Sequence, residues 1–478
     1  MKKTLISALL AGVSSLWAMA DNEWIHIYTT SQKGTTEVES LAPSKISEIK
    51  YQEVEDDRYD AMRIFTADGE ILTRRMDAMD SLVVGRHVPT MYINIENNAE
   101  VVVKDQYLNA TISVEGNGVV DDFEEAEVTI KGRGNSTWFQ FPKKPWRLKF
   151  AKKQEFCGLK KAKNFALIAN FIDPSNMRNT VAFRIAHLLD MPWTNSSVPV
   201  NIVMNGTYRG IYMVTEKIGI NGASVDIDET QGILWEFDTN YDENYKFRSS
   251  GVGLPVMVKD PDFDELYEAD PTGPTPSQRL QSWASDFNAM EAAVLGRSYT
   301  DWTELLDLES AVKYVFVNAL AGNDEPCWPK SVYMHKATKE DKYVFGPVWD
   351  FDWAYTFGGS YEEGVGNPNS TWLSKTYESG GAFFQYLVKD ERFMAAFREL
   401  LDRFYDEEMD GLMEFIDEYS TLIRPAAYQN GARWPQGSST NHPGVMSSDH
   451  FDEHLTNLKN YLKTRIEFMH SHRNCGLY

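Results

Sequence analysis

The feature that most constrains the fold is a change of local pattern near Gly222. Before this residue, apolar residues alternate over short runs, as in Met91–Ile95 and Ala110–Val114, which is typical of β-strands. After it, four longer segments carry apolar residues at helical spacing: Gln278–Leu295, Leu308–Ala321, Glu391–Met409 and Phe451–Met469. This order predicts an α+β protein in which a β-rich part precedes a mainly helical part.

One helix is expected within the β-rich part. Asp173-Pro174-Ser175 offers an N-cap followed by proline in the first helical turn, and helical periodicity continues to Leu189. Val198–Met204 and Gly210–Thr215 then flank Asn205-Gly206, a dipeptide typical of a two-residue β-hairpin. The helix and the hairpin therefore complete the strand-rich part.

The first twenty residues have the pattern of a secretory signal peptide. Lys2 and Lys3 form a charged start, Leu5–Leu16 an apolar core, and Ala18-Met19-Ala20 a cleavage site of small residues. The apolar run is shorter than the about 20 residues that span a bilayer, and no later segment approaches that length. We therefore expect an exported protein without a transmembrane segment, located in the periplasm, at the cell surface or outside the cell.

Charge and cysteine content exclude two classes of function. The formal net charge is −23, and removing the signal peptide would make it more negative, which argues against nucleic acid as a partner. The three cysteines, Cys157, Cys327 and Cys475, are too few for a disulfide framework and lack the spacing of a metal site. A single disulfide remains an open alternative.

Against this acidity, residues 131–150 carry six cations and no carboxylate, in the run KGRGNSTWFQFPKKPWRLKF. If the part after Pro145 is a strand, its alternation places Arg147 and Lys149 on one face. The opposite face is apolar and consists of Trp146, Leu148 and Phe150. The segment indicates an anion site, although a solvated basic hairpin would have the same charge pattern.

A glycine-rich turn precedes that strand. Gly132 and Gly134 flank Arg133, and the small polar residues Asn135, Ser136 and Thr137 follow. Glycine gives the backbone the freedom to wrap around phosphate oxygens, and the polar groups can contact them. No GxxxxGK[ST] motif is present, so a P-loop nucleotide site is not expected.

The segments GRGNSTW and KKPWRLKF resemble the signature of the CotH family, spore-coat-type kinases related distantly to protein kinases. The resemblance continues in the family's order through LKKAKNFALIANFIDPSNMRN, NGTYRGIYMVTEKI, GND, WDFDWAY and RWP, over roughly residues 125 to 470. It implies a two-lobed protein-kinase-like fold. It also implies binding of ATP with Mg²⁺ or Mn²⁺, and phosphorylation of Ser or Thr in a secreted or envelope protein.

This resemblance and the local patterns predict four parts of the chain. Residues 1–20 are the signal peptide, and residues 21–90, with short polar alternations, form a small β accessory domain. Residues 91–222 form the β-rich N-lobe, because strands, one helix and a hairpin are the order of a kinase-like small lobe. Residues 223–478 form the mainly helical C-lobe.

Candidate acidic residues follow from spacing and resemblance. Asp350 and Asp352 stand two residues apart, so on a strand both carboxylates would face one way and could share a hard cation. Pairing with arginine or capping of a loop is an equal alternative. Asp324 follows a predicted helix in the turn Gly322–Glu325, where a lone Asp often only stabilises the turn. The resemblance matches Asp324 to the catalytic and Asp350 to the metal-binding aspartate of the family.

The remaining roles fall to the basic segment and to one glutamate. Lys149 is the candidate for the kinase-type strand lysine and would act with Asp324, whereas Arg133, Asn135, Ser136 and Arg147 would bind phosphates. Glu216 lies where a kinase hinge would meet adenine. It could instead pair with Lys149, and the sequence leaves this open.

The sequence also leaves two other functions open. Where many family members carry Asn, this chain has Ser331, a weaker metal ligand, which indicates either one metal or lost catalysis. A non-catalytic cell-surface adhesin or assembly protein on a kinase-like scaffold is therefore the main alternative. A carbohydrate-active enzyme ranks below it, because adjacent acids on one strand face cannot bracket a sugar ring.

Overall fold

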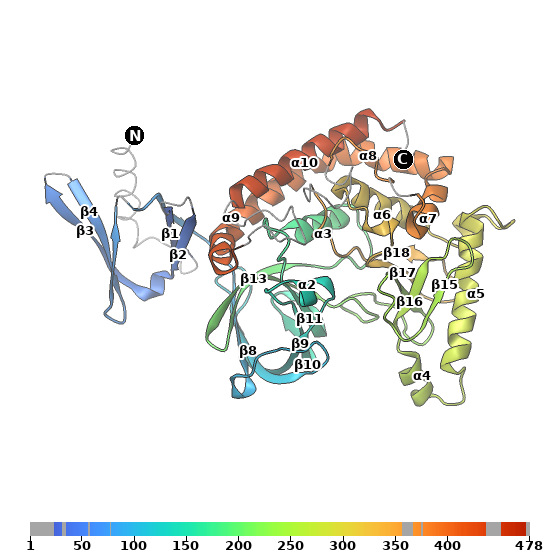
Figure 1. Cartoon of the computed structure of the whole chain (residues 1–478), viewed down its shortest axis with the longest axis horizontal. Helices are drawn as coiled ribbons and strands as arrows, with labels where there is room; N and C mark the ends of the chain where they lie inside the picture. The colour runs from blue at the N-terminus through green and yellow to red at the C-terminus, as the bar shows by residue number, and fades with distance from the viewer. Residues whose placement is uncertain are drawn as a thin grey trace.

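The structure is a computed structural model that describes residues 23–30, 35–55, 58–76, 78–355, 367–373, 376–435 and 451–474. Within these ranges the chain has the expected mixed α+β composition. Figure 1 shows a small β region at the N-terminal end, a barrel in the middle, and helices with a second sheet beyond it. The predicted signal peptide and Cys475 lie outside the described residues.

Seven strands close into a barrel in the order β10-β11-β13-β12-β7-β8-β9. Their bounds are β7 (Thr90–Ile95), β8 (Leu108–Glu115), β9 (Phe123–Gly132), β10 (Trp146–Phe156), β11 (Leu159–Ile168), β12 (Val198–Met204) and β13 (Thr207–Glu216). Neighbouring strands are antiparallel except β12 and β7, which pair in parallel. Trp146, Leu148 and Phe150 point into the barrel core, which confirms the predicted apolar face of β10.

The hairpin predicted at Asn205-Gly206 is confirmed. It joins β12 and β13, and both turn residues have positive φ, +49° and +73°, as the favoured two-residue hairpin turn requires. The predicted helix also forms, as α3 (Arg178–Leu188), but it begins later than expected. Asp173 and Pro174 therefore lie in a turn before the helix, because the Asp173 carboxylate accepts the N–H groups of Ser175 and Arg178, both at 2.9 Å.

A second sheet of five strands follows the barrel, in the order β15-β16-β14-β17-β18. The bounds are β14 (Ile233–Phe237), β15 (Lys246–Arg248), β16 (Pro255–Asp260), β17 (Val332–Lys336) and β18 (Val344–Phe345). Helices α4 (Phe263–Ala269) and α5 (Pro276–Val294) connect β16 to the rest of the chain. The sheet is therefore built from segments far apart in sequence.

The remaining regular structure of the described chain is mainly helical, and the periodicity predicted the first, third and fifth of its five α-helices but not the other two. The helices are α6 (Leu308–Ala321), α7 (Ser379–Leu387), α8 (Glu391–Arg403), α9 (Met409–Arg433) and α10 (Phe451–Ser471). Helix α6 is buried along its whole length except its first two residues, and it lies at the centre of the largest hydrophobic core. Helices α3, α8, α9 and α10 contribute to the same core (Figure 1).

The described residues between 24 and 85 form two three-stranded sheets with the orders β2-β1-β6 and β3-β4-β5. Their strands are β1 (Trp24–Thr30), β2 (Thr36–Leu41), β3 (Ile46–Glu55), β4 (Arg58–Thr66), β5 (Ile71–Arg75) and β6 (Ser81–Gly85). The first sheet contacts α9, because the Gln429 amide donates to the Val38 carbonyl oxygen at 3.2 Å. The region is β-structured as expected, and its status as a separate accessory domain stays a prediction.

None of the described helices combines the length and the apolar character that a bilayer crossing requires. Cys157 and Cys327 are both buried, and no disulfide joins them to each other.

Candidate functional site

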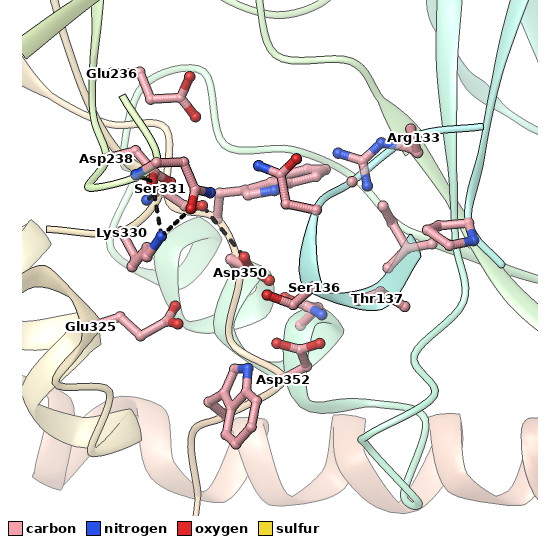
Figure 2. A pocket seen from close by; sticks show the side chains of 18 of the residues that line it. Arg133, Ser136, Thr137, Glu236, Asp238, Glu325, Lys330, Ser331, Asp350 and Asp352 are labelled. Atoms are coloured by element: carbon pink, nitrogen blue, oxygen red, sulfur yellow. Dashed lines mark hydrogen bonds and ion pairs between the residues drawn. The ribbon is translucent and has the colours of Figure 1, made fainter. Parts of the chain in front are cut away.

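A cavity of about 600 Å³, here called the central cavity, lies between the barrel and the second sheet. The turn after β9 forms one wall, and residues from β14, β17 and the segment after β18 form the opposite wall (Figure 2). Its volume falls in the range of about 300–1,000 Å³ typical of small-molecule sites. Six of the residues predicted from the sequence line it: Arg133, Asn135, Ser136, Asp324, Asp350 and Asp352.

The barrel-side wall is the predicted glycine-rich turn, which leads into the short helix α2 (Ser136–Gln140). At Gly132 an added Cβ would lie 2.5 Å from the Trp138 ring, and Gly134 has a φ of +82°. Both positions therefore require glycine, one for close packing and one for its backbone conformation. As a result, Arg133 projects from a turn whose path is fixed on both sides.

The Arg133 side chain reaches across the cavity toward the second sheet. Its guanidinium lies over the Trp349 ring, 5.6 Å from the ring centre. Burial lowers the pKa of Arg133, and the Asp350 carboxylate opposes that effect. Arginine remains charged even when buried, so Arg133 places a fixed positive charge opposite the acidic residues.

Asp350 and Asp352 occupy an irregular segment after β18 rather than the strand that the sequence predicted. Asp350 has a φ of +67°, a conformation incompatible with a strand. The two carboxyl groups nevertheless meet. Burial, and then the charge and hydrogen bonding of Asp350, raise the pKa of Asp352 well above its usual range. Two neighbouring carboxylates of this kind retain a proton unless a cation neutralises them.

Backbone strain accompanies this acidic segment. Ser331 has a φ of +49°, and its hydroxyl lies 3.3 Å from an Asp350 carboxylate oxygen (Figure 2). Positive φ at a residue other than glycine costs about 1–3 kcal/mol, and such residues cluster at functional sites. Both residues line the central cavity, so the strain is located at the candidate site.

The acidic segment is held from behind by the start of α3. Arg178 donates a hydrogen bond from its guanidinium to the Asp352 carbonyl oxygen at 2.7 Å, and its Nε lies 3.4 Å from the Asp173 carboxylate. The Asn179 amide oxygen accepts the Phe351 N–H at 2.7 Å. Sequence reasoning missed these supporting roles, although the residues lie within the quoted segment DPSNMRN.

Asp324 lies just past the end of α6, where Gly322 adopts a φ of +63° and ends the helix as predicted. Its side chain is buried at the cavity wall. The next residue, Glu325, also lines the cavity, and burial, followed by the charge of Asp350, raises the pKa of Glu325 well above its usual range. Its Oε2 atom is buried and has no hydrogen-bond partner in the described structure. Glu325 was not predicted, because no motif or residue spacing distinguishes this single Glu after Asp324 in the sequence.

The acidic pair fits a divalent cation. Asp352 is 8% exposed, and its Oδ1 atom is buried without a hydrogen-bond partner among the described residues. A buried carboxylate oxygen of this kind is costly unless it is paired or binds a metal. Across the described ranges, however, no group of three or more His, Cys, Asp or Glu is arranged to hold a metal ion. Asp350 and Asp352 would therefore need further ligands from a substrate or from water, which is usual for Mg²⁺.

The model of the CotH kinase protein family matches residues 130–469 of this chain. The match spans more than half of the sequence and includes both walls of the central cavity. The chain belongs to the CotH kinase family. A search of curated proteins found no match.

In this CotH family member, three residues predicted for the site lie away from the central cavity. Lys149 is exposed on the outer face of β10, with Nζ 5.8 Å from the centre of the Tyr107 ring, and Arg147 lines a smaller neighbouring pocket. Glu216 is buried at the end of β13, where it accepts the Ser196 N–H at 2.9 Å. Burial raises the pKa of Glu216. The structure therefore brings neither Lys149 nor Glu216 to the acidic pair.

Two further cations of the basic segment also serve the fold. Lys143 is fully buried, donates to the Ile211 carbonyl oxygen at 2.5 Å, and lies 4.5 Å from the centre of the Tyr212 ring. Burial lowers the pKa of Lys143 well below its usual range. Lys144 donates to the Trp138 carbonyl oxygen at 2.5 Å. Only some of the cations in residues 131–150 of this CotH family member therefore lie at the central cavity.

Sequence reasoning also missed the charged rim on the second sheet. Asp238, at the end of β14, accepts a hydrogen bond from Lys330 at 3.1 Å and from the Ser331 N–H at 3.3 Å (Figure 2). Burial raises the pKa of Asp238. No local signal identifies this pair, because its members are 92 residues apart and meet only through sheet pairing.

Proposed function

We propose that this protein is an exported CotH-type kinase that transfers the γ-phosphoryl group of ATP to Ser or Thr of a secreted or envelope protein, with Mg²⁺ or Mn²⁺. The observation that carries the proposal is the central cavity, in which Arg133 faces Asp350 and Asp352. Phosphoryl transfer requires cations on the phosphates, a metal held by carboxylates, and a carboxylate directed at the acceptor hydroxyl. In this proposal the barrel acts as the smaller lobe of a kinase-like fold, and the second sheet with its helices as the larger lobe.

The glycine-rich turn would hold the triphosphate. Arg133 would donate hydrogen bonds from its guanidinium to phosphate oxygens, and Asn135 and Ser136 would add contacts from the same wall. Support comes from the fixed path of the turn and from the half-buried position of Arg133, whose pKa the Asp350 carboxylate influences. Lys149 has no role in this proposal, because it lies on the exposed part of β10.

Asp350 and Asp352 would hold the metal, and the Arg178 and Asn179 contacts would keep their segment in place. A bound Mg²⁺ or Mn²⁺ would neutralise charge on the transferred phosphoryl group. Asp324 would orient the acceptor hydroxyl and accept its proton, because its carboxyl group lines the same cavity at the end of a rigid helix.

A non-catalytic adhesin or assembly protein is the second candidate. Ser331 favours it, because the resemblance matches this residue to an Asn of the family and its hydroxyl contacts Asp350. Calorimetry with ATP and Mn²⁺ separates the two candidates. A protein that binds no nucleotide but binds a glycan or another protein tightly would be an adhesin.

The kinase proposal is tested by transfer of labelled phosphate from ATP to the protein itself or to exported proteins of its source. We expect Asp324→Asn and Asp350→Ala each to abolish transfer. Asp121→Asn, which changes an exposed acid between β8 and β9, serves as the matched control and should leave transfer unchanged. Full activity in Asp324→Asn and Asp350→Ala would refute the assigned roles.

A further inference from the structure

A smaller pocket of about 200 Å³, here called the cationic pocket, adjoins the central cavity. Its wall comes from β9, β10, the start of the segment after β13, and the second sheet. Six cations and one carboxylate line it: Lys104, Lys131, Arg133, Arg147, Lys217, Lys259 and Asp105. In a chain with a net charge of −23, composition does not explain such a cluster.

Two of these cations already interact with acids outside the pocket. Lys259 forms ion pairs with Glu236 at 2.7 Å and Glu243 at 3.0 Å. Arg133 faces Asp350 in the central cavity. These contacts explain why both cations are present without any ligand in the cationic pocket.

Of the other four cations, Lys104 donates to the neutral Asn135 amide oxygen at 2.9 Å. The remaining three, Lys131, Arg147 and Lys217, form no ion pair within the described part of the chain, although the charges of Asp260 and Glu243 act on Lys217 and raise its pKa. Arg147 donates only to the neutral Asn164 amide, at 2.8 Å. Lys131 lies over the Tyr107 ring, 4.9 Å from its centre. Donors with positive charge therefore converge on a space that offers them one carboxylate, Asp105.

The pKa values report the resulting repulsion. Burial, and then the charges of Arg147 and Lys259, lower the pKa of Lys217 to about 8, against the opposing charges of Asp260 and Glu243. Burial and then Arg147 also lower the pKa of Lys131. A folded protein that keeps like charges this close is destabilised by them unless an anion is bound.

We propose that the cationic pocket binds a phosphate dianion, held by Lys131, Arg147 and Lys217, at a site separate from the nucleotide. The two spaces adjoin and share part of their lining, including Arg133 and Trp349. Asp350 and Asp352 line only the central cavity, whereas the three proposed cations line only the cationic pocket. The pocket is also smaller than the about 300 Å³ at which sites for drug-sized ligands begin. Inorganic phosphate and a phosphoserine of a bound polypeptide offer the same chemistry.

Calorimetry on the full chain without nucleotide tests the proposal, so its outcome does not depend on kinase activity. The probes are inorganic phosphate and a phosphoseryl peptide, with the unphosphorylated peptide as reference. We expect saturable binding of one probe, weakened about tenfold or more in Lys217→Met and Arg147→Gln, because each change removes a charge-assisted hydrogen bond. Lys152→Met, an exposed lysine on β10, should bind as the wild type does. Binding of neither probe, or equal binding by all variants, would overturn the proposal.

Two further measurements show whether the Lys217→Met variant is folded and whether phosphate and ATP bind at the same site. Without phosphate, Lys217→Met should have a Tm at least as high as the wild type, because it relieves repulsion with Arg147. Its affinity for ATP with Mn²⁺ should be unchanged. Parallel loss of phosphate and ATP binding would show that the pocket belongs to the nucleotide site and would overturn a separate one.

Discussion

The Arg178 guanidinium donates to the main-chain carbonyl oxygen of Asp352, a residue 174 positions later in the chain, at 2.7 Å. Asp173 contacts the same guanidinium at 3.4 Å, so the charge of Arg178 is balanced. This contact does not reach the cavity. It holds the backbone from which the Asp352 carboxyl group projects.

The first prediction concerns this contact. Arg178→Lys should weaken Mn²⁺ binding about 10- to 100-fold, because groups that orient metal ligands have effects of this size. The measurement is calorimetry with Mn²⁺ and ATP. Arg184→Lys, on the same helix, is the control and should bind as the wild type does. Unchanged Mn²⁺ affinity in Arg178→Lys would show that Asp352 does not depend on this support.

The second prediction concerns Ser331. Asn tolerates a φ of +49° better than Ser, and its amide oxygen is the stronger metal ligand, so Ser331→Asn should raise both the Tm and the Mn²⁺ affinity. Ser331→Ala should lower the Mn²⁺ affinity, because it removes the hydroxyl 3.3 Å from Asp350. If Ser331→Asn binds Mn²⁺ no better than the wild type, this residue is not near the metal.

The third prediction concerns pH. Because the pKa of Asp352 is raised, Mn²⁺ must displace a proton, and the affinity for Mn²⁺ should rise with pH by up to about tenfold per unit. Asp352→Asn should flatten this dependence. In the metal-free protein, the free energy of unfolding changes with pH in the opposite direction. Because folding raises the pKa of this carboxyl group, stability is lost as pH rises from its unfolded-state pKa toward its folded-state pKa. A Mn²⁺ affinity independent of pH in the wild type would contradict the assignment.

The fourth prediction concerns the glycine-rich turn. Gly132→Ala should lower the free energy of unfolding by about 1–3 kcal/mol, because the new Cβ would lie 2.5 Å from the buried Trp138 ring. The turn would shift, and ATP affinity should fall as well. Gly206→Ala is a useful comparison: its Cβ would meet no atom within 4 Å, so only its φ of +73° is unfavourable and ATP binding should persist. Urea unfolding and calorimetry measure the two effects.

The local sequence pattern predicts the barrel strands individually, but it does not predict that they close into a barrel. Alternation gave the strands and the inward face of β10, since neighbouring side chains on a strand point to opposite sides. The barrel closes through parallel pairing of β12 with β7, where Asn201 lies opposite Thr90. Pairing between segments so far apart leaves no local trace, so the barrel could not be predicted.

The candidate site shows the same division. Spacing identified Asp350 and Asp352 as a pair, although a turn rather than a strand brings them together. The alternation of side chains along β10 correctly placed Arg147 and Lys149 on one face of the strand. It could not show which part of that face lies next to the central cavity. Arg178 was missed because its contact with the acidic segment depends entirely on tertiary packing.

The end of α9 is bonded to the hairpin between β12 and β13. Trp434 donates to the Arg209 carbonyl oxygen at 2.8 Å and Arg433 to that of Tyr208 at 3.2 Å, in each case across 225 residues. Synthesis must therefore pass residue 434 before these two contacts with the barrel can form.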